Sequence, residues 1–303
     1  MLKFAAAATT GLLLPLGNNA WPRAAPRMAR ARWFLFLPGA VDGLNVVAPY
    51  AEEAYYDYRR SIALDPPGSA DGLLDLDGHF GLHPALAPLM PLMPLWNQRQ
   101  LAFVHACGSP DSARSHFEAQ AYMETATPGV PTTRTGWLNR LTLRYGRAAD
   151  MVVFGPIQPL ITRGPAPTAT FPVGRGATHL KPLAEGLATF WQSLGPLWQD
   201  SVVLVISEFG QTARENGDRG TDHGHGNVHW VLGGKIHGGR IYGDWRGLAE
   251  HALPQQWDLP VTTDFLSVID LVLHKYLATN KAIRHHVLPD FTPDYQHIQV
   301  LFA

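Results

Sequence analysis

Short apolar runs alternate along this chain with longer segments whose apolar residues recur at helical spacing. Strands are predicted for the apolar runs, each bounded by polar, Gly or Pro residues, at 33–37, 100–106, 151–154 and 201–206. Helices are predicted at 51–58, 86–96, 113–124, 136–144, 183–197 and 265–277. This alternation predicts a single α/β domain over residues 33–303 with a mostly parallel sheet.

The pattern of the first residues indicates an export signal rather than the start of the folded domain. Residues 1–16 hold one Lys and then an Ala/Leu-rich run that is short for a membrane span, which is typical of a secretory signal. Residues 1–32 are therefore predicted to be a signal peptide and linker, and the protein to be periplasmic or extracellular. The alternative is an N-terminal core helix.

Composition excludes several function classes. Of 303 residues, 46% are hydrophobic and 16% charged, so the chain can bury a large core and is not disordered. The formal net charge of -1 gives no electrostatic reason to expect nucleic acid or an anionic membrane as a partner. Cys107 is the only cysteine, so no intrachain disulfide can form, and a buried, inert thiol is favoured over a nucleophile.

The strand predicted at 201–206 leads into the most informative stretch. Ligands of parallel sheets bind beyond the carboxyl ends of the strands, where Glu208 lies, and Asp222, His223 and His225 follow in a Gly-rich loop. Imidazole and carboxylate groups are the usual non-thiol ligands of divalent ions, so these four residues are predicted to bind a metal. Zinc is favoured, with calcium, magnesium or manganese as alternatives. The competing interpretation is a hydrated turn that happens to carry histidines.

Asp42 follows the first predicted strand in the same way. It is either a fifth metal ligand or a turn former, because Asp42 precedes Gly43 and Asp-Gly is a strong turn signal.

A second chemical stretch follows the strand predicted at 100–106. Ser112 is a candidate nucleophile with Ser115 as the alternate, Arg114 a candidate anion-binding group, and His116 a further catalytic candidate. Asp111 or Ser112 would also serve as the N-cap of the helix at 113–124, and the two interpretations are compatible.

Several blocks together resemble one family. They are SEFGQTARENG (207–217), TDHGHGN (221–227), LGGKIHGGRIYGDW (232–245), DLPVTTDF (258–265), GLHPALAPL (81–89) and SPDSARSHFEAQAYMETATPG (109–129). The family is a large group of exported bacterial proteins, catalogued only as a domain of unknown function and usually placed in the alkaline phosphatase and sulfatase superfamily. The resemblance covers residues 33–291.

This resemblance implies an alkaline phosphatase-like fold, a doubly wound, mostly parallel sheet with helices on both faces. It also implies a divalent metal pair and hydrolysis of phosphate or sulfate esters. Asp222-His223 resembles the Asp-His metal-ligand pair of the superfamily. Asp111-Ser112-Ala113 resembles its nucleophile segment, and the spacing from Ser112 to His116 resembles a related mutase motif.

One departure from the family pattern bears on activity. Members carry a Gly-(aromatic)-Asp-Thr-His segment that Pro165 to Pro172 replaces here, and the later Ala-Thr-His at 177–179 lacks the Asp. A strand and half of a metal site are therefore expected to be missing near residues 155–182. His179, Asp42 and Asp264 are possible substitute ligands.

Two functions remain in competition. The first is an exported, metal-dependent hydrolase of small-molecule or polymer phosphate or sulfate esters, without nucleic acid or a stable membrane span. The second is a non-catalytic or degenerate exported member that keeps the fold and at most one ion, because two-metal hydrolysis requires both sets of ligands.

Overall fold

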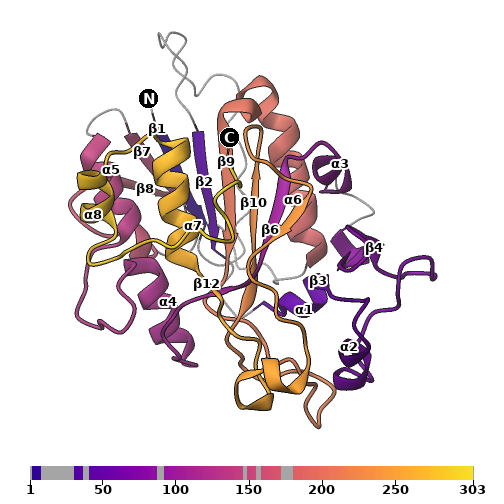
Figure 1. The fold of residues 1–303 in the computed structure, drawn as a ribbon. Coiled ribbons are helices and arrows are strands. Elements are labelled where there is room, and N and C mark those ends of the chain that lie inside the picture. The colour runs from indigo at the N-terminus through magenta and orange to yellow at the C-terminus, as the bar shows by residue number, and fades with distance from the viewer. Residues whose placement is uncertain are drawn as a thin grey trace.

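The structure is a computed structural model that describes residues 2–7, 31–36, 41–86, 92–145, 149–154, 158–171 and 180–302. In these residues a nine-stranded sheet forms the centre of an α/β fold (Figure 1). Its strands are β1 (Leu2–Ala7), β2 (Ala31–Phe36), β6 (Leu101–Gly108), β7 (Ala149–Phe154), β8 (Thr168–Phe171), β9 (Ser201–Ile206), β10 (Asn227–Gly233), β11 (Arg240–Tyr242) and β12 (Thr263–Asp264).

The sheet is mostly parallel. Its order is β11-β6-β10-β9-β2-β1-β7-β8, and β12 pairs with the end of β6 beyond β11. Among the described strands of this sheet, β10 runs antiparallel to both of its neighbours, and all other neighbouring pairs are parallel. The carboxyl ends of β6 and β9 therefore lie at the same edge, where β10 begins.

Alternate side chains of each central strand enter different cores. In β6, Ala102 and Val104 pack in a core shared with two helices, whereas Leu101 and Phe103 pack in a core shared with two others. Strand side chains alternate between faces, so helices cover both faces of the sheet. The core with Ala102 and Val104 contains α5 (Trp137–Tyr145) and α7 (Phe265–Leu271). The core with Leu101 and Phe103 contains α3 (Leu92–Asn97) and α6 (Leu180–Leu194).

Smaller elements surround this sheet. A second sheet pairs β3 (Val47–Ala48), β5 (Gly81–Leu82) and β4 (Leu74–Asp75). The other α-helices are α1 (Gly43–Val46), α2 (Glu53–Tyr58), α4 (His116–Thr125) and α8 (Lys281–Val287). Short 3-10 helices lie at Pro84–Leu86, Leu160–Thr162, Gly195–Asp200, Glu250–Ala252 and Pro254–Gln256. None of the described helices is long and apolar enough to cross a membrane.

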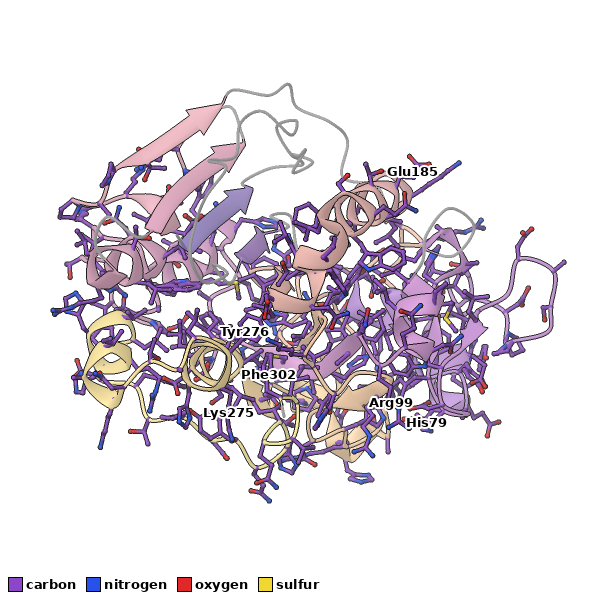
Figure 2. All side chains as sticks on the ribbon, turned by 90° about the horizontal axis from the view of Figure 1, so that it is seen from above. His79, Arg99, Glu185, Lys275, Tyr276 and Phe302 are labelled. Carbon is purple, nitrogen blue, oxygen red and sulfur yellow. The ribbon has the colours of Figure 1, made fainter. Side chains whose placement is uncertain are left out.

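The C-terminal segment returns to the sheet. Phe302 is buried with its ring centroid 6.0 Å from that of Tyr276, and Figure 2 shows the two residues beside Lys275. Tyr276 ends a π-helical turn, Val272–Tyr276, that continues α7. The predicted helix at 265–277 is therefore one continuous helical segment that changes its hydrogen-bond pattern at Val272.

Most predicted elements are confirmed with small shifts. Of the helix predicted at 86–96 the structure describes α3 over Leu92–Asn97, and residues 87–91 lie outside the described part. The helix predicted from 113 begins at His116, and its N-cap is Ser115, whose side chain makes no capping hydrogen bond. Within residues 155–182 the short strand β8 pairs with β7, and the absence of a family segment there stays a prediction. The signal peptide stays a prediction: Leu2–Ala7 is a strand, and residues 8–30 lie outside the described part.

Candidate functional site at the carboxyl edge of the sheet

Three loops meet at the edge where β6 and β9 end. The loop after β6 carries Arg114 and leads to His116 at the start of α4, and the loop after β9 carries Glu208. The segment before β10 carries His223 and His225. In Figure 1, α4 and β12 mark this edge at the lower end of the sheet. This is where a mostly parallel sheet binds its ligands.

A chain of three side chains crosses these loops. Nδ1 of His116 lies 2.7 Å from Oε1 of Glu208, and Nε2 of His116 lies 3.0 Å from Nε2 of His223. Glu208 is 1% exposed, and the Ser207 hydroxyl donates to its Oε2 at 3.0 Å. The Phe209 ring packs against both imidazoles, with centroids 4.8 and 5.0 Å away. The buried carboxylate of Glu208 thus fixes one end of this row of side chains, and the Phe209 ring fixes the orientation of the two imidazoles.

The hydrogen-bond partners decide where the imidazole protons lie. Nδ1 of His116 faces a carboxylate, and Nδ1 of His223 faces the carbonyl oxygen of Arg114 at 3.1 Å. Both oxygens only accept, so each Nδ1 carries a hydrogen. A neutral imidazole has a single N–H, which leaves a lone pair on each Nε2. Two lone pairs that face each other at 3.0 Å repel unless a cation, either a proton or a metal ion, is shared between them.

His225 is held away from this pair. Its Nε2 lies 3.0 Å from the carbonyl oxygen of Ser109 and 3.2 Å from that of Asp111, so this nitrogen donates to the loop after β6. The loop is therefore attached at two points, through His225 near its start and through His223 at Arg114. His225 is a positioning residue in this structure.

Asp222 and Asp42 also have other partners. Asn216 donates to Oδ1 of Asp222 at 3.1 Å in an exposed loop. Asp42 forms an ion pair of 2.8 Å with Arg59, a fully buried guanidinium that also donates to the carbonyl oxygens of Thr212 and Ala213. The structure thus brings Glu208, His116 and His223 together, but not Asp222, Asp42 or His225 with them.

The catalytic candidates after β6 lie on the surface of the same loop. Ser112 and Ser115 are exposed, and Ser112 lies between the two attachment points at Asp111 and Arg114. The half-exposed guanidinium of Arg114 forms an ion pair with Asp258, which is buried. Burial raises the pKa of Asp258, and the positive charge of Arg114 opposes that change. Sequence patterns did not single out Asp258, because it lies 144 positions from its partner.

The glycines of this region allow the backbones to approach. A Cβ on Gly224 would lie 2.4 Å from the carbonyl carbon of Gln211, and one on Gly210 would lie 2.0 Å from the carbonyl oxygen of Gly226. Gly210 and Gly224 join the two segments through backbone hydrogen bonds of 2.9 and 3.1 Å. This contact places His223 next to the loop after β9, and no larger residue fits at either position.

The described residues contain no group of three or more His, Cys, Asp or Glu side chains arranged to hold a metal ion. The two facing imidazoles are the nearest approach to such a site. His179, a possible substitute ligand, lies outside the described residues. The metal site therefore stays a prediction.

Comparison with known proteins gives a family match over part of the chain and no activity. Residues 174–274 match the family model described as "Protein of unknown function (DUF1501)". The match spans β9, the His223 loop, β10 and α7, and it agrees with the resemblance to a family of unknown function. No curated protein and no solved structure matches this chain.

Proposed function

We propose that this protein is an exported, metal-dependent hydrolase-like protein that acts on phosphate or sulfate esters, with His116 and His223 binding a divalent cation through Nε2. The observation that carries the proposal is the pair of Nε2 atoms 3.0 Å apart, each with its Nδ1 bonded to an oxygen acceptor.

The surroundings of both imidazoles fit a metal. Metal-binding histidines generally donate their second ring N–H to a carboxylate or a backbone carbonyl. Glu208 provides the carboxylate for His116, and Arg114 provides the carbonyl for His223. Zinc suits imidazole ligands, and catalytic sites leave positions open for water or substrate. A bound divalent ion would polarise the ester and lower the pKa of a bound water.

The remaining groups divide the work on the substrate. Ser112 lies on a loop that is attached on both sides, which holds its hydroxyl at the edge of the site. This hydroxyl is the proposed nucleophile. Arg114 would bind the anionic group of the ester, and Asp258 orients its guanidinium. Glu208 keeps the proton of His116 on Nδ1, which keeps Nε2 available.

The alkaline phosphatase-like arrangement is the finer part of this proposal. Its support is a mostly parallel sheet with helices on both faces and candidate residues after β6 and β9. Export rests on the Ala/Leu-rich start of the chain.

A non-catalytic member that keeps at most one ion is the second candidate. The observation that favours it is the engagement of Asp222 with Asn216 and of His225 with two carbonyl oxygens, which leaves two histidines as ligands among the described residues. Loss of one ion from a two-metal site is expected to reduce turnover by at least about a thousandfold.

One set of proteins separates these functions. Metal content is measured by elemental analysis in the wild type, His116→Ala, His223→Ala and the control His285→Ala, which changes an exposed histidine on α8. Chromogenic phosphate and sulfate esters are then tested with the wild type and Ser112→Ala.

We expect the wild type and His285→Ala to contain metal and both site variants to lose it. We also expect the wild type to turn over an ester and Ser112→Ala to be inactive. Metal without turnover identifies the non-catalytic member. Equal, near-zero metal in all four proteins would mean that the imidazoles share a proton, and the proposal would fail.

A further inference from the structure

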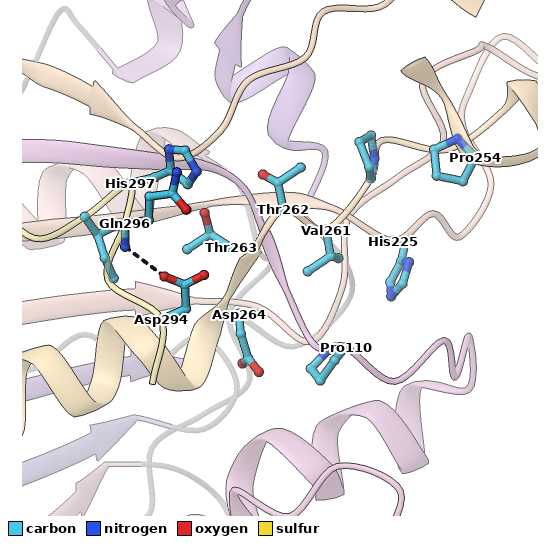
Figure 3. A pocket seen from close by; sticks show the side chains of 12 residues that line it. Pro110, His225, Pro254, Val261, Thr262, Thr263, Asp264, Asp294, Gln296 and His297 are labelled. Carbon is cyan, nitrogen blue, oxygen red and sulfur yellow. Dashed lines mark hydrogen bonds between the residues drawn. The ribbon is translucent and has the colours of Figure 1, made fainter. Parts of the chain in front are cut away.

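A cavity of about 560 Å³ lies beside the candidate site (Figure 3). Pro110 and His225 line it on the side of the loop that leads to His116, and β12 contributes Thr263 and Asp264. The C-terminal segment closes the opposite side with Gln296 and its neighbours. Its size lies in the range of small-molecule sites, which is about 300–1,000 Å³.

The wall of this cavity offers both donors and acceptors. Asp264 uses Oδ1 to cap α7, accepting from the Leu266 amide at 2.8 Å. The buried hydroxyl of Thr263 has no hydrogen-bond partner among the described residues. Because Nε2 of His225 donates to two carbonyl oxygens, its Nδ1 is left as an acceptor.

The charges of the wall disfavour an anion. Asp264 and Asp294 are acidic, and none of the described residues that line the cavity is Lys or Arg. A phosphate or sulfate group here would face carboxylates with no cation to offset them. The anionic part of an ester therefore belongs at Arg114, outside this cavity.

The uncharged part of the wall suits hydroxyl groups. No Phe, Tyr or Trp is among the described lining residues, so no such ring offers a face to a cation. Gln296 and His297 are exposed polar side chains. Their N–H groups do not attract a cation, but they can donate to a hydroxyl oxygen. Proline and valine surfaces, among them Pro260 and Val261, suit the C–H face of a saturated ring.

We propose that this cavity binds a neutral, hydroxyl-rich ligand about the size of a monosaccharide. Such a ligand donates hydroxyl protons to Asp264 and Asp294 and accepts from Gln296 and His297, while its C–H groups lie against the prolines. The site needs neither a metal ion nor turnover, so it stands whether or not the protein is a hydrolase.

Saturation-transfer NMR tests the site in the full chain. The probes are methyl α-D-glucopyranoside, methyl α-D-galactopyranoside and myo-inositol, with choline and inorganic phosphate as charged comparisons. The variants are Gln296→Ala/His297→Ala and Asp294→Ala, all exposed positions that leave the core unchanged. The matched control is Gln98→Ala, another exposed glutamine, which follows α3. Thermal unfolding verifies that each variant is folded.

At least one neutral probe is expected to bind with a Kd of about 1 mM. Binding should weaken at least about tenfold in the double variant and in Asp294→Ala, and stay unchanged in Gln98→Ala. Absence of transfer to all three neutral probes would overturn the proposal. So would binding that the variants leave unchanged, or binding of choline or phosphate in place of the neutral probes.

Discussion

The Nε2 atoms of His116 and His223 lie 3.0 Å apart across 107 positions of sequence, and each ring has its other nitrogen fixed by an oxygen acceptor. Each imidazole thereby presents a lone pair to the other. The partners behind the rings matter as much as the rings, because they determine which nitrogen can bind a cation.

Glu208→Gln is therefore expected to weaken metal binding by about 10- to 100-fold, the usual effect of removing a carboxylate behind a metal-binding histidine. The amide is similar in shape and keeps a partner for Ser207, so the fold is expected to persist. Titration calorimetry with Zn²⁺ measures the affinity. Glu118→Gln, an exposed change in the first turn of α4, is the control. Equal affinity in Glu208→Gln and wild type would refute the role assigned to Glu208.

Gly224→Ala is expected to destabilise the protein by about 1–3 kcal/mol, because the added methyl overlaps backbone that cannot move freely. The methyl would lie 2.4 Å from the carbonyl carbon of Gln211. Urea unfolding measures the loss. Gly217→Ala provides the control, since a Cβ there meets no atom within 4 Å. A Gly224→Ala protein as stable as Gly217→Ala would show that the two segments separate readily.

Arg114→Ala should cost more stability at pH 8 than at pH 4. Asp258 is buried, and burial raises the pKa of its carboxyl group. Without the guanidinium that pKa rises further, so the penalty grows as pH rises and the carboxylate has to ionise. Arg114 is half-exposed, so we expect a loss of about 1–3 kcal/mol at pH 8, less than for a fully buried pair. Arg114→Ala/Asp258→Asn should recover much of it, and a pH-independent loss would contradict this explanation.

Acid should destabilise the protein through two buried histidines. Burial lowers the pKa of His105 and of His229 from 6.5 to about 4. Between those values the unfolded chain binds more protons than the folded one, so stability falls as pH decreases. The slope is about 1.4 kcal/mol per pH unit for each histidine.

Urea midpoints measured from pH 7 to pH 4 report this slope. His105→Gln should flatten it, whereas the exposed change His285→Gln should leave it unchanged. The same slope in wild type and His105→Gln would rule His105 out as its source.

The sequence by itself determined the class of fold and the parts of the chain that carry chemistry. Runs such as 201–206 are apolar over strand length, and burial on both faces of a sheet requires that pattern, so β9 was predictable to the residue. Glu208 was identifiable for a similar reason, since polar residues directly after buried strands lie at the edge where ligands bind. His116 and His223 were identifiable as histidines in the polar segments that follow these strands. The short β8 was not, because Pro-rich surroundings hide a four-residue strand whose stability comes from pairing with β7.

Only the tertiary structure decided which of the candidates meet. Asp222, His223 and His225 are neighbours in sequence, yet they face Asn216, His116 and two backbone carbonyls. Successive side chains of an extended segment point to opposite faces, and the backbone bends at His225, so spacing alone cannot show which residues share a site. The roles of Glu208 behind His116 and of Asp258 behind Arg114 depend on contacts between distant segments. Those contacts form only when the loops after β6 and β9 are brought to one edge by the sheet.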